Sequence, residues 1–262
     1  MILLTTAWML TIAAATTVLI PNHSTLSGEG FFDNCKKIWS HRTMGSGGGE
    51  NTVEGLRDVL SLGVGGVEID IYYDEKRDRL YVQSEEYRSA DVPLALSLAE
   101  MLAAVPSGSR LWLDFWNLRQ LNEVVAPKAI SRLASDIRDA DLGQHVIIES
   151  TSASLLHELH AAKLRTSLWV QIAEPDDSAA GLARHVVGAL RARYQLFTAP
   201  ASAVSLDHQQ YSQFVGIVFT GVPILLFTIN DKLRLIAAAK DSHVKAILTD
   251  EPFLHKEDTC SK

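Results

Sequence analysis

The chain has 262 residues, of which 47% are hydrophobic and 21% charged, and its formal net charge at pH 7 is -7. A chain of this length can bury the core of one enzyme-sized domain. The acidic balance, without a block of Lys and Arg residues, argues against a broad nucleic-acid-binding surface. We therefore expect no nucleic-acid partner, and any affinity for phosphate has to be local.

The first 20 residues carry no charged side chain and are apolar apart from threonines, and a polar stretch follows at Pro21–Thr25. We interpret residues 1–25 as an export segment, either a cleaved signal peptide or a retained membrane anchor. Its length lies between that of a signal peptide and the roughly 20 residues of a minimal spanning helix. We expect an exported protein that is secreted, periplasmic or anchored on the extracytoplasmic side, with membrane association through this segment if it is retained.

After this segment, short β-branched or aromatic runs alternate with amphipathic stretches. Eight strands are predicted, at 36–42, 66–73, 110–116, 145–150, 165–171, 203–207, 223–230 and 244–250. Helices are predicted between them, at 50–63, 96–105, 121–141, 152–163, 177–195, 209–219 and 232–242. A further strand-like run at 79–83 predicts a hairpin-like extension over the mouth of the sheet.

This βα repeat predicts an α/β protein with one TIM-like (β/α)8 barrel domain over residues 33–256. An open doubly wound sheet is the alternative. Eight βα units, with carboxylates on several non-adjacent strands, favour closure of the sheet.

Acidic residues end two of the predicted strands. Glu68 and Asp70 close the run Gly66–Asp70, and Asp114 closes Leu111–Asp114. Because the C-terminal ends of parallel strands open on one face, we expect these carboxylates to converge and to suit a hard divalent cation. A lone Glu-x-Asp is more often a salt-bridged or exposed pair. The prediction of a cation site therefore depends on the third carboxylate, Asp114.

His41 and Arg42 follow the first predicted strand and should project onto the same face. They would add a titratable imidazole and a permanent cation to the three carboxylates. This set of side chains suits chemistry on a phosphate.

Seven motifs in order resemble the signature of the glycerophosphodiester phosphodiesterase family, within the phospholipase C-like phosphodiesterase superfamily of TIM barrels. They are His41–Arg42, Glu50–Thr52, Gly66–Asp70, Leu94–Val105, Leu111–Asp114, Leu226–Asn230 and Ala246–Pro252, and they span about residues 36 to 253. The resemblance implies Mg²⁺ or Ca²⁺ held by Glu68, Asp70 and Asp114, and cleavage of a phosphodiester assisted by His41.

The remaining site residues are assigned around this centre. We expect Arg42 to bind the phosphate, and Glu50, Thr228 and Asn230 to line the substrate pocket. The expected substrate is a small phosphodiester or a lysophospholipid.

The chain departs from the family pattern in two features, which together involve three positions. Ser84 and Glu85 stand where the family has its second catalytic histidine in a His-Asp pair, and Trp116 stands where it has a lysine. All three are expected in the substrate pocket. Since general acid/base assistance contributes typically about 10²- to 10⁴-fold, the loss of one partner should slow the reaction without abolishing it.

The sequence therefore predicts a divalent-metal-dependent phosphoric diester hydrolase that acts on glycerophosphodiesters or phospholipid-derived substrates. Two alternatives stay open. One is a catalytically impaired barrel that binds phosphodiester or polyol head groups. The other is a cyclising, phospholipase D-like lyase that uses a substrate hydroxyl as nucleophile and releases a cyclic phosphate.

The first prediction concerns the cysteines. The chain has two, Cys35 and Cys260, and an even pair in an exported protein indicates a disulfide. Closure of a barrel brings its first and last strands together, so we expect the two cysteines to be linked. Mass spectrometry of the unreduced, secreted protein should detect the linked peptides, whereas complete alkylation of both thiols would contradict the prediction.

Overall fold

The computed structural model describes residues 30–45, 49–83 and 96–251. The predicted export segment, Ser84, Glu85 and Cys260 lie outside these described residues, so the predictions made for them remain predictions. Among the described residues, no helix is both long and apolar enough to cross a membrane.

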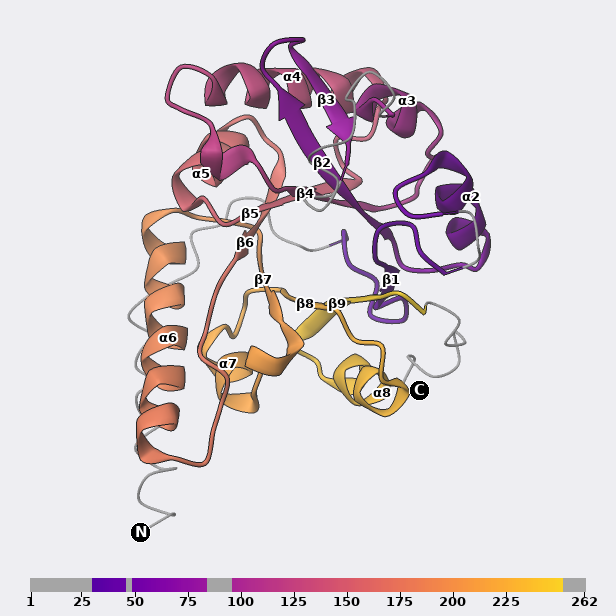
Figure 1. Cartoon of the computed structure of the whole chain (residues 1–262). Coiled ribbons are helices and arrows are strands. Elements are labelled where there is room, and N and C mark those ends of the chain that lie inside the picture. The colour runs from indigo at the N-terminus through magenta and orange to yellow at the C-terminus, as the bar shows by residue number, and fades with distance from the viewer. Residues whose placement is uncertain (1–29, 46–48, 84–95, 252–262) are drawn as a thin grey trace.

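Eight parallel strands form a closed barrel (Figure 1). They are β1 (Ile38–Ser40), β2 (Val67–Asp74), β4 (Leu111–Phe115), β5 (Val146–Ser150), β6 (Arg165–Trp169), β7 (Ala203–Asp207), β8 (Ile224–Phe227) and β9 (Val244–Thr249). The first strand pairs with the last one and also with β2, which closes the ring. The predicted barrel and its eight strands are confirmed.

The additional strand β3 (Arg79–Val82) pairs antiparallel with β2, as the hairpin prediction requires. The turn between the two strands contains Asp78 with a φ of 49°. Asp is one of the few residues that adopt this left-handed conformation readily, because its short side chain can hydrogen-bond locally.

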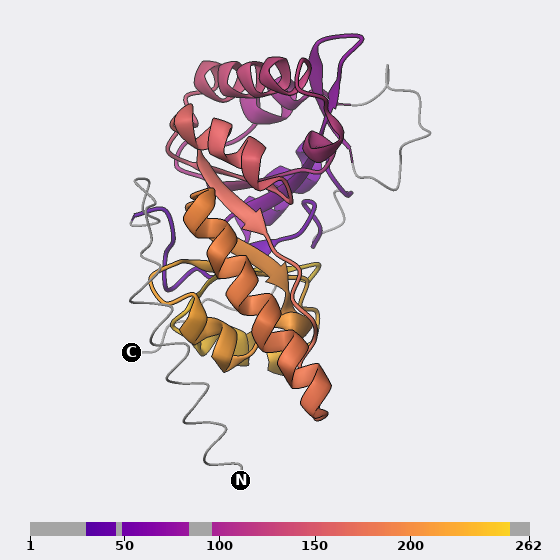
Figure 2. The ribbon, with the colours of Figure 1, turned by 90° about the vertical axis from the view of Figure 1, so that its left-hand side faces the viewer.

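Helices pack around the barrel, as the two ribbon views show (Figures 1 and 2). They are α2 (Val53–Ser61), α3 (Leu98–Ala103), α4 (Ala126–Asp139), α5 (Ala153–Ala161), α6 (Ala179–Thr198), α7 (Gln213–Val218) and α8 (Lys232–Lys240). Hydroxyl and carboxylate side chains cap several of their N-termini, and Thr52, Ser178 and Asp231 each accept a backbone N–H three residues ahead.

The predicted helix ends differ from the observed ones by a few residues. One correction falls in the predicted helix 209–219, where a short 3₁₀ turn at His208–Gln210 comes first and α7 starts only after Ser212. The Ser212 side chain accepts the N–H of Val215, so it fixes the start of α7.

Two apolar cores stabilise the barrel. The larger core lies between the sheet and the helices. The smaller core fills the barrel interior with Phe31, Trp39, Trp112, Ile147, Ala203, Leu225, Ala246 and Leu248. Phe31 precedes β1, and its ring lies 6.0 Å from that of Trp39, so aromatic side chains close the N-terminal end of the barrel. Polar interior side chains therefore collect at the opposite end.

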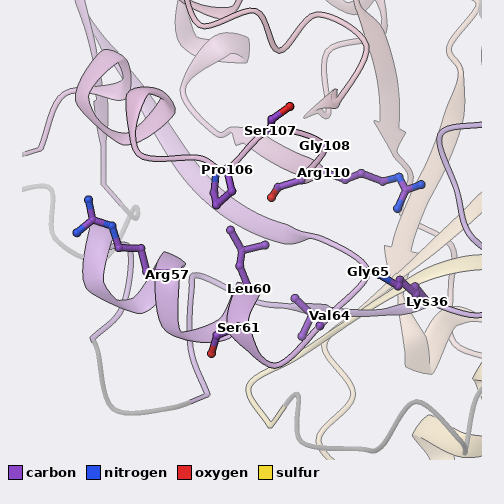
Figure 3. Close-up of a pocket in the computed structure, with 12 residues that line it drawn as sticks. Lys36, Arg57, Leu60, Ser61, Val64, Gly65, Pro106, Ser107, Gly108 and Arg110 are labelled. Atoms are coloured by element: carbon purple, nitrogen blue, oxygen red, sulfur yellow. The ribbon is translucent and has the colours of Figure 1, made fainter.

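A surface hollow of about 510 Å³ lies at the N-terminal end of the barrel, where Lys36, Gly65 and Arg110 precede three strands and Arg57 of α2 faces them. Figure 3 shows the guanidinium groups of Arg57 and Arg110 pointing to opposite sides, away from each other. The two cations do not converge on a common ligand in this hollow. It also lies at the end of the barrel opposite to the strand C-termini.

Gly65 gives a test of the close packing at this end. A Cβ atom there would overlap the carbonyl oxygen of Lys36 and lie 2.7 Å from Nε1 of Trp39, so the backbone has to shift. We expect Gly65→Ala to lower the free energy of unfolding by about 1–3 kcal/mol, and the Tm by roughly 3–12 °C, in thermal denaturation. A matched Gly143→Ala variant has open space around the new methyl group and should keep the wild-type Tm or exceed it. Equal Tm values for the two variants would contradict the prediction.

Candidate active site at the mouth of the barrel

The carboxylates predicted on β2 and β4 lie on neighbouring strands in matched register. Asp70 pairs with Asp114, and Glu68 pairs with Trp112. Side chains alternate across a strand, so Glu68 and Asp70 share the face on which Trp112 fills the barrel interior. Glu68 is 2% and Asp70 4% exposed. Glu68, Asp70 and Asp114 therefore lie on the same face of two adjacent strands.

A fourth carboxylate, Glu149 of β5, was missed by the sequence analysis. It pairs in register with Asp114, is buried, and faces Ser205 and the indole of Trp112. Its Oε2 atom has no hydrogen-bond partner in the described part of the chain. The signal was its place one residue before the end of a predicted strand, but an isolated Glu in a β-branched run does not reveal which face it occupies.

Burial and mutual repulsion dominate the electrostatics of this group. Burial raises the pKa of Glu68 well above its usual range, and the charges of Asp70 and Asp114 raise it further. Burial also raises the pKa of Asp70, although Arg42 and Asn51 counteract the increase. Ionisation of these carboxyl groups therefore costs free energy unless a cation is near.

His41 leaves β1 with its imidazole fixed by a carboxylate. Its Nδ1 lies 2.7 Å from Oδ1 of Asp250, and its Nε2 lies 3.9 Å from Oε2 of Glu68. The hydrogen bond from His41 lowers the pKa of Asp250, which stays ionised. A carboxylate at Nδ1 favours the tautomer that carries its proton there, so Nε2 can accept a proton on the side of the buried carboxylates.

Asp250 is itself held by Asn230, which follows β8. Nδ2 of Asn230 donates to Oδ2 of Asp250 at 2.6 Å, and the backbone N–H of Asp250 donates to Oδ1 of Asn230 at 2.9 Å. The sequence analysis assigned Asn230 to the pocket. In the structure Asn230 contacts Asp250, which in turn contacts His41. Thr228, two residues earlier, is partly exposed beside the same strand end.

Arg42 connects several acidic groups. Its backbone N–H donates to Oε2 of Glu68 at 2.9 Å, its Nε lies 2.8 Å from Oδ2 of Asp70, and its Nη1 donates to Oε1 of Glu50 at 3.0 Å. Its φ of 51° lies in the left-handed region, which is uncommon for a residue with a side chain. These contacts compensate the backbone strain. The predicted phosphate-binding residue is thus engaged by carboxylates, and the predicted pocket residue Glu50 is one of them.

Asn51 also supports the carboxylate of Asp70. Its Nδ2 donates to Oδ2 of Asp70 at 3.1 Å, and its Oδ1 accepts the backbone N–H of Asp70 at 3.3 Å. Both atoms of the amide therefore orient Asp70.

Carboxylate oxygens are the ligands that Mg²⁺ and Ca²⁺ prefer, and a dication would reverse the mutual repulsion of Glu68, Asp70 and Asp114. The donor chemistry therefore fits a hard divalent cation. In the arrangement observed for the described residues, no three His, Cys, Asp or Glu side chains are grouped closely enough to hold one. Arg42 contacts Oδ2 of Asp70, so a metal ion on that oxygen has to displace the guanidinium group.

Trp116 lies just beyond β4 and stacks on Tyr72, with ring centroids 5.3 Å apart and an interplanar angle of 22°. Its Nε1 donates to the carbonyl oxygen of Gln83 at 2.9 Å. The residue that replaces the lysine of the resembled family is therefore an anchored aromatic side chain at the mouth.

No known protein family matches the sequence, and no curated protein matches it. Solved structures do match the fold. A glycerophosphodiester phosphodiesterase from Parabacteroides distasonis superposes with a TM-score of 0.64 at 14% identity, over 82% of this chain and 93% of the other. An Oleispira antarctica phosphodiesterase in complex with the product sn-glycerol-3-phosphate gives 0.63 at 16% identity, over 89% and 99%.

The glycerophosphodiester phosphodiesterase from Thermotoga maritima gives a TM-score of 0.59 at 16% identity, over 83% of this chain and 96% of the other. The fold is that of the glycerophosphodiester phosphodiesterases. This agrees with the resemblance in sequence, and it covers nearly the whole length of the solved chains. At these identities the likeness concerns the path of the backbone, so the role of each residue has to be argued from its own contacts.

Glu149 gives a test of the electrostatics. Burial, and then repulsion by Asp114, raise the pKa of Glu149 well above its usual range, so the folded state binds a proton more tightly than the unfolded state does. Stability from this group is therefore lost as the pH rises above the unfolded-state pKa. In EDTA at pH 8, we expect Glu149→Gln to raise the Tm by roughly 2–8 °C, about 1–2 kcal/mol, with a smaller gain at pH 5. The exposed control Glu123→Gln should change neither value, and a loss of stability in Glu149→Gln at pH 8 would contradict the prediction.

Proposed function

We propose that this protein is a divalent-metal-dependent phosphodiester hydrolase that acts on glycerophosphodiesters or phospholipid-derived diesters. The observation that carries the proposal is the imidazole of His41, fixed at Nδ1 by Asp250 and directed at Nε2 toward Glu68. The shared fold with phosphodiesterases, one of which was solved with sn-glycerol-3-phosphate, supports the same class of reaction.

In this proposal His41 is the principal acid/base. Its Nε2 accepts the proton of an attacking water molecule while the water oxygen bonds to phosphorus. The P–O bond to the alcohol then breaks on the opposite side of phosphorus, where the leaving alkoxide takes a proton from solvent, and the imidazolium releases its proton to solvent. The products are a phosphomonoester and an alcohol. The Asp250 carboxylate stabilises the imidazolium that forms between the two steps.

Glu68, Asp70 and Asp114 would hold the divalent cation, which supplies polarisation of a phosphoryl oxygen and neutralisation of developing charge when bound. Arg42 would then exchange its contact with Asp70 for one with the phosphate. A planar guanidinium group can donate two parallel hydrogen bonds to phosphate oxygens, so this exchange preserves its hydrogen bonding.

The alternatives predict different products. A head-group-binding barrel would keep metal and ligand affinity without turnover, as the replaced histidine position at Ser84 allows. A lyase would release a cyclic phosphate. Export of the protein and the roles of Ser84 and Glu85 remain part of the proposal.

The test is a metal-dependent activity screen on glycerophosphodiesters and lysophospholipids, with product analysis by phosphorus NMR. We expect a linear phosphomonoester, activity lost in EDTA, and a fall of at least about 10² in kcat/KM in both His41→Ala and Asp70→Asn. Calorimetric titration should show that Asp70→Asn also loses divalent cation binding. The exposed control Asp58→Asn should match the wild type.

A cyclic phosphate product would show that the protein is a lyase and not a hydrolase. Head-group binding without turnover at high enzyme concentration would identify the binding barrel. Wild-type cation affinity in Asp70→Asn would place the metal ion elsewhere.

A further inference from the structure

Aromatic side chains continue the strands that carry the carboxylates. Tyr72 follows Asp70 by two residues in β2, and Trp116 follows Asp114 by two residues, just beyond β4. Because strand side chains alternate, each ring lies on the same face as the carboxylate before it. The register that pairs Asp70 with Asp114 brings the two rings together, and they stack at 5.3 Å. The stacked pair forms a wall directly beyond the two carboxylates.

The wall is held in a fixed orientation. The indole N–H of Trp116 is used by the carbonyl oxygen of Gln83, and the N–H of Gln83 donates to the carbonyl oxygen of Asp70 at 3.1 Å. Trp116 therefore offers a ligand its ring carbon atoms and not its single hydrogen-bond donor. Both Tyr72 and Trp116 are partly exposed.

A second aromatic pair lies on strands β6 and β8. The rings of Trp169 and Phe227 meet edge to face at 5.2 Å, and Phe227 lies 6.5 Å from Trp112 of the barrel interior. Trp169 and Phe227 are also partly exposed at the ends of their strands. Two pairs of aromatic rings thus border the mouth, one from β2 and the end of β4 and the other from β6 and β8.

The polar groups between these strands are mainly acidic. The site described above contains the carboxyl groups of Glu50, Glu68, Asp70, Asp114, Glu149 and Asp250. The one arginine among its residues, Arg42, is engaged with two of them. Trp116 stands where the resembled family has a lysine, so the chain has an aromatic face in place of a positive charge.

Aromatic faces beside surplus carboxylates favour a weakly hydrated cation. A quaternary ammonium group has no N–H to satisfy, and it is attracted to the negative face of Trp and Tyr rings. A primary ammonium group is more strongly hydrated and gains less on an apolar wall. A second anionic group on the substrate would be repelled by the carboxylates, and a neutral polyol gains neither attraction.

We propose that the mouth formed by Tyr72, Trp116, Trp169 and Phe227 selects phosphodiesters whose alcohol carries a quaternary ammonium group of the choline type. The inference rests on the proposed function for the phosphodiester, while the selection itself is a property of binding. A soluble glycerophosphodiester and a lysophospholipid can bring the same head group.

The binding test uses phosphocholine and its carbon isostere, 3,3-dimethylbutyl phosphate, in which an uncharged tert-butyl group of the same shape replaces the trimethylammonium group. Calorimetry with both ligands at the same Mg²⁺ or Ca²⁺ concentration should give about 3- to 30-fold tighter binding of phosphocholine, the range of a cation–π contact. Equal affinities in the wild type, or tighter binding of 3,3-dimethylbutyl phosphate, would overturn the proposal.

Variants separate the aromatic contribution from general attraction by the carboxylates. Trp116→Leu should reduce the ratio of the two affinities toward one, while Trp116→Phe, which keeps a ring, should retain part of it. Tyr194→Leu changes an exposed aromatic residue on α6, far along the chain from the mouth, and should keep the wild-type ratio. A full ratio in a folded Trp116→Leu variant, checked by circular dichroism, would contradict the role of the wall.

Hydrolysis assays then distinguish this inference from the proposed function. We expect glycerophosphocholine to have a KM about 3- to 30-fold below that of the 3,3-dimethylbutyl diester, with similar kcat, and the difference to shrink in Trp116→Leu. Preference for phosphocholine without turnover of any diester would refute the hydrolase and support the binding inference. Turnover of diesters without a preference for phosphocholine would support the hydrolase and refute the binding inference. Comparing glycerophosphocholine with lysophosphatidylcholine identifies whether a soluble or a lipid source supplies the head group.

Discussion

Closing eight parallel strands into a barrel places every second side chain of each strand in one confined interior. In this protein the N-terminal part of that interior is filled by apolar and aromatic side chains, including Trp39 and Trp112. The mouth instead receives Glu68, Asp70, Asp114 and Glu149. Burial, and then repulsion by the neighbouring carboxylates, raise the pKa of Glu68 and of Glu149, and much of the surrounding structure compensates for this.

The compensation comes from loops rather than strands. Arg42 adopts a left-handed backbone conformation, and this allows its N–H and its guanidinium group to contact acidic groups of β2 at the same time. Asn51, also with a positive φ of 53°, holds Asp70 with both atoms of its amide. Strain at such positions persists only where several contacts support it, and here those contacts orient the carboxylates proposed to bind a cation.

Asp250 connects the two halves of the site. It fixes His41 through one oxygen and accepts a hydrogen bond from Asn230 through the other, so the end of β9 positions a residue at the end of β1. Barrel closure makes this contact possible, since β1 and β9 are adjacent. The geometry leaves Nε2 of His41 as the proton-accepting atom of the proposed reaction. The aromatic residues beyond the carboxylates then decide which alcohol the proposed enzyme accepts.

The sequence by itself determined the barrel and which acidic residues lie in its strands β2 and β4. The βα repeat predicted all eight strands, and the strand ends predicted that Glu68, Asp70 and Asp114 converge, because alternation and parallel order are local properties of the chain. The contact of Asp250 with His41, across 209 positions, was not predicted. The tertiary structure decided that contact, and it decided two further features as well. Glu149 joins the carboxylates because strand register, which depends on the packing of the whole barrel, sets it beside Asp114. Arg42 lies on Asp70 because a folded loop brings it there, and no spacing in the sequence encodes that meeting.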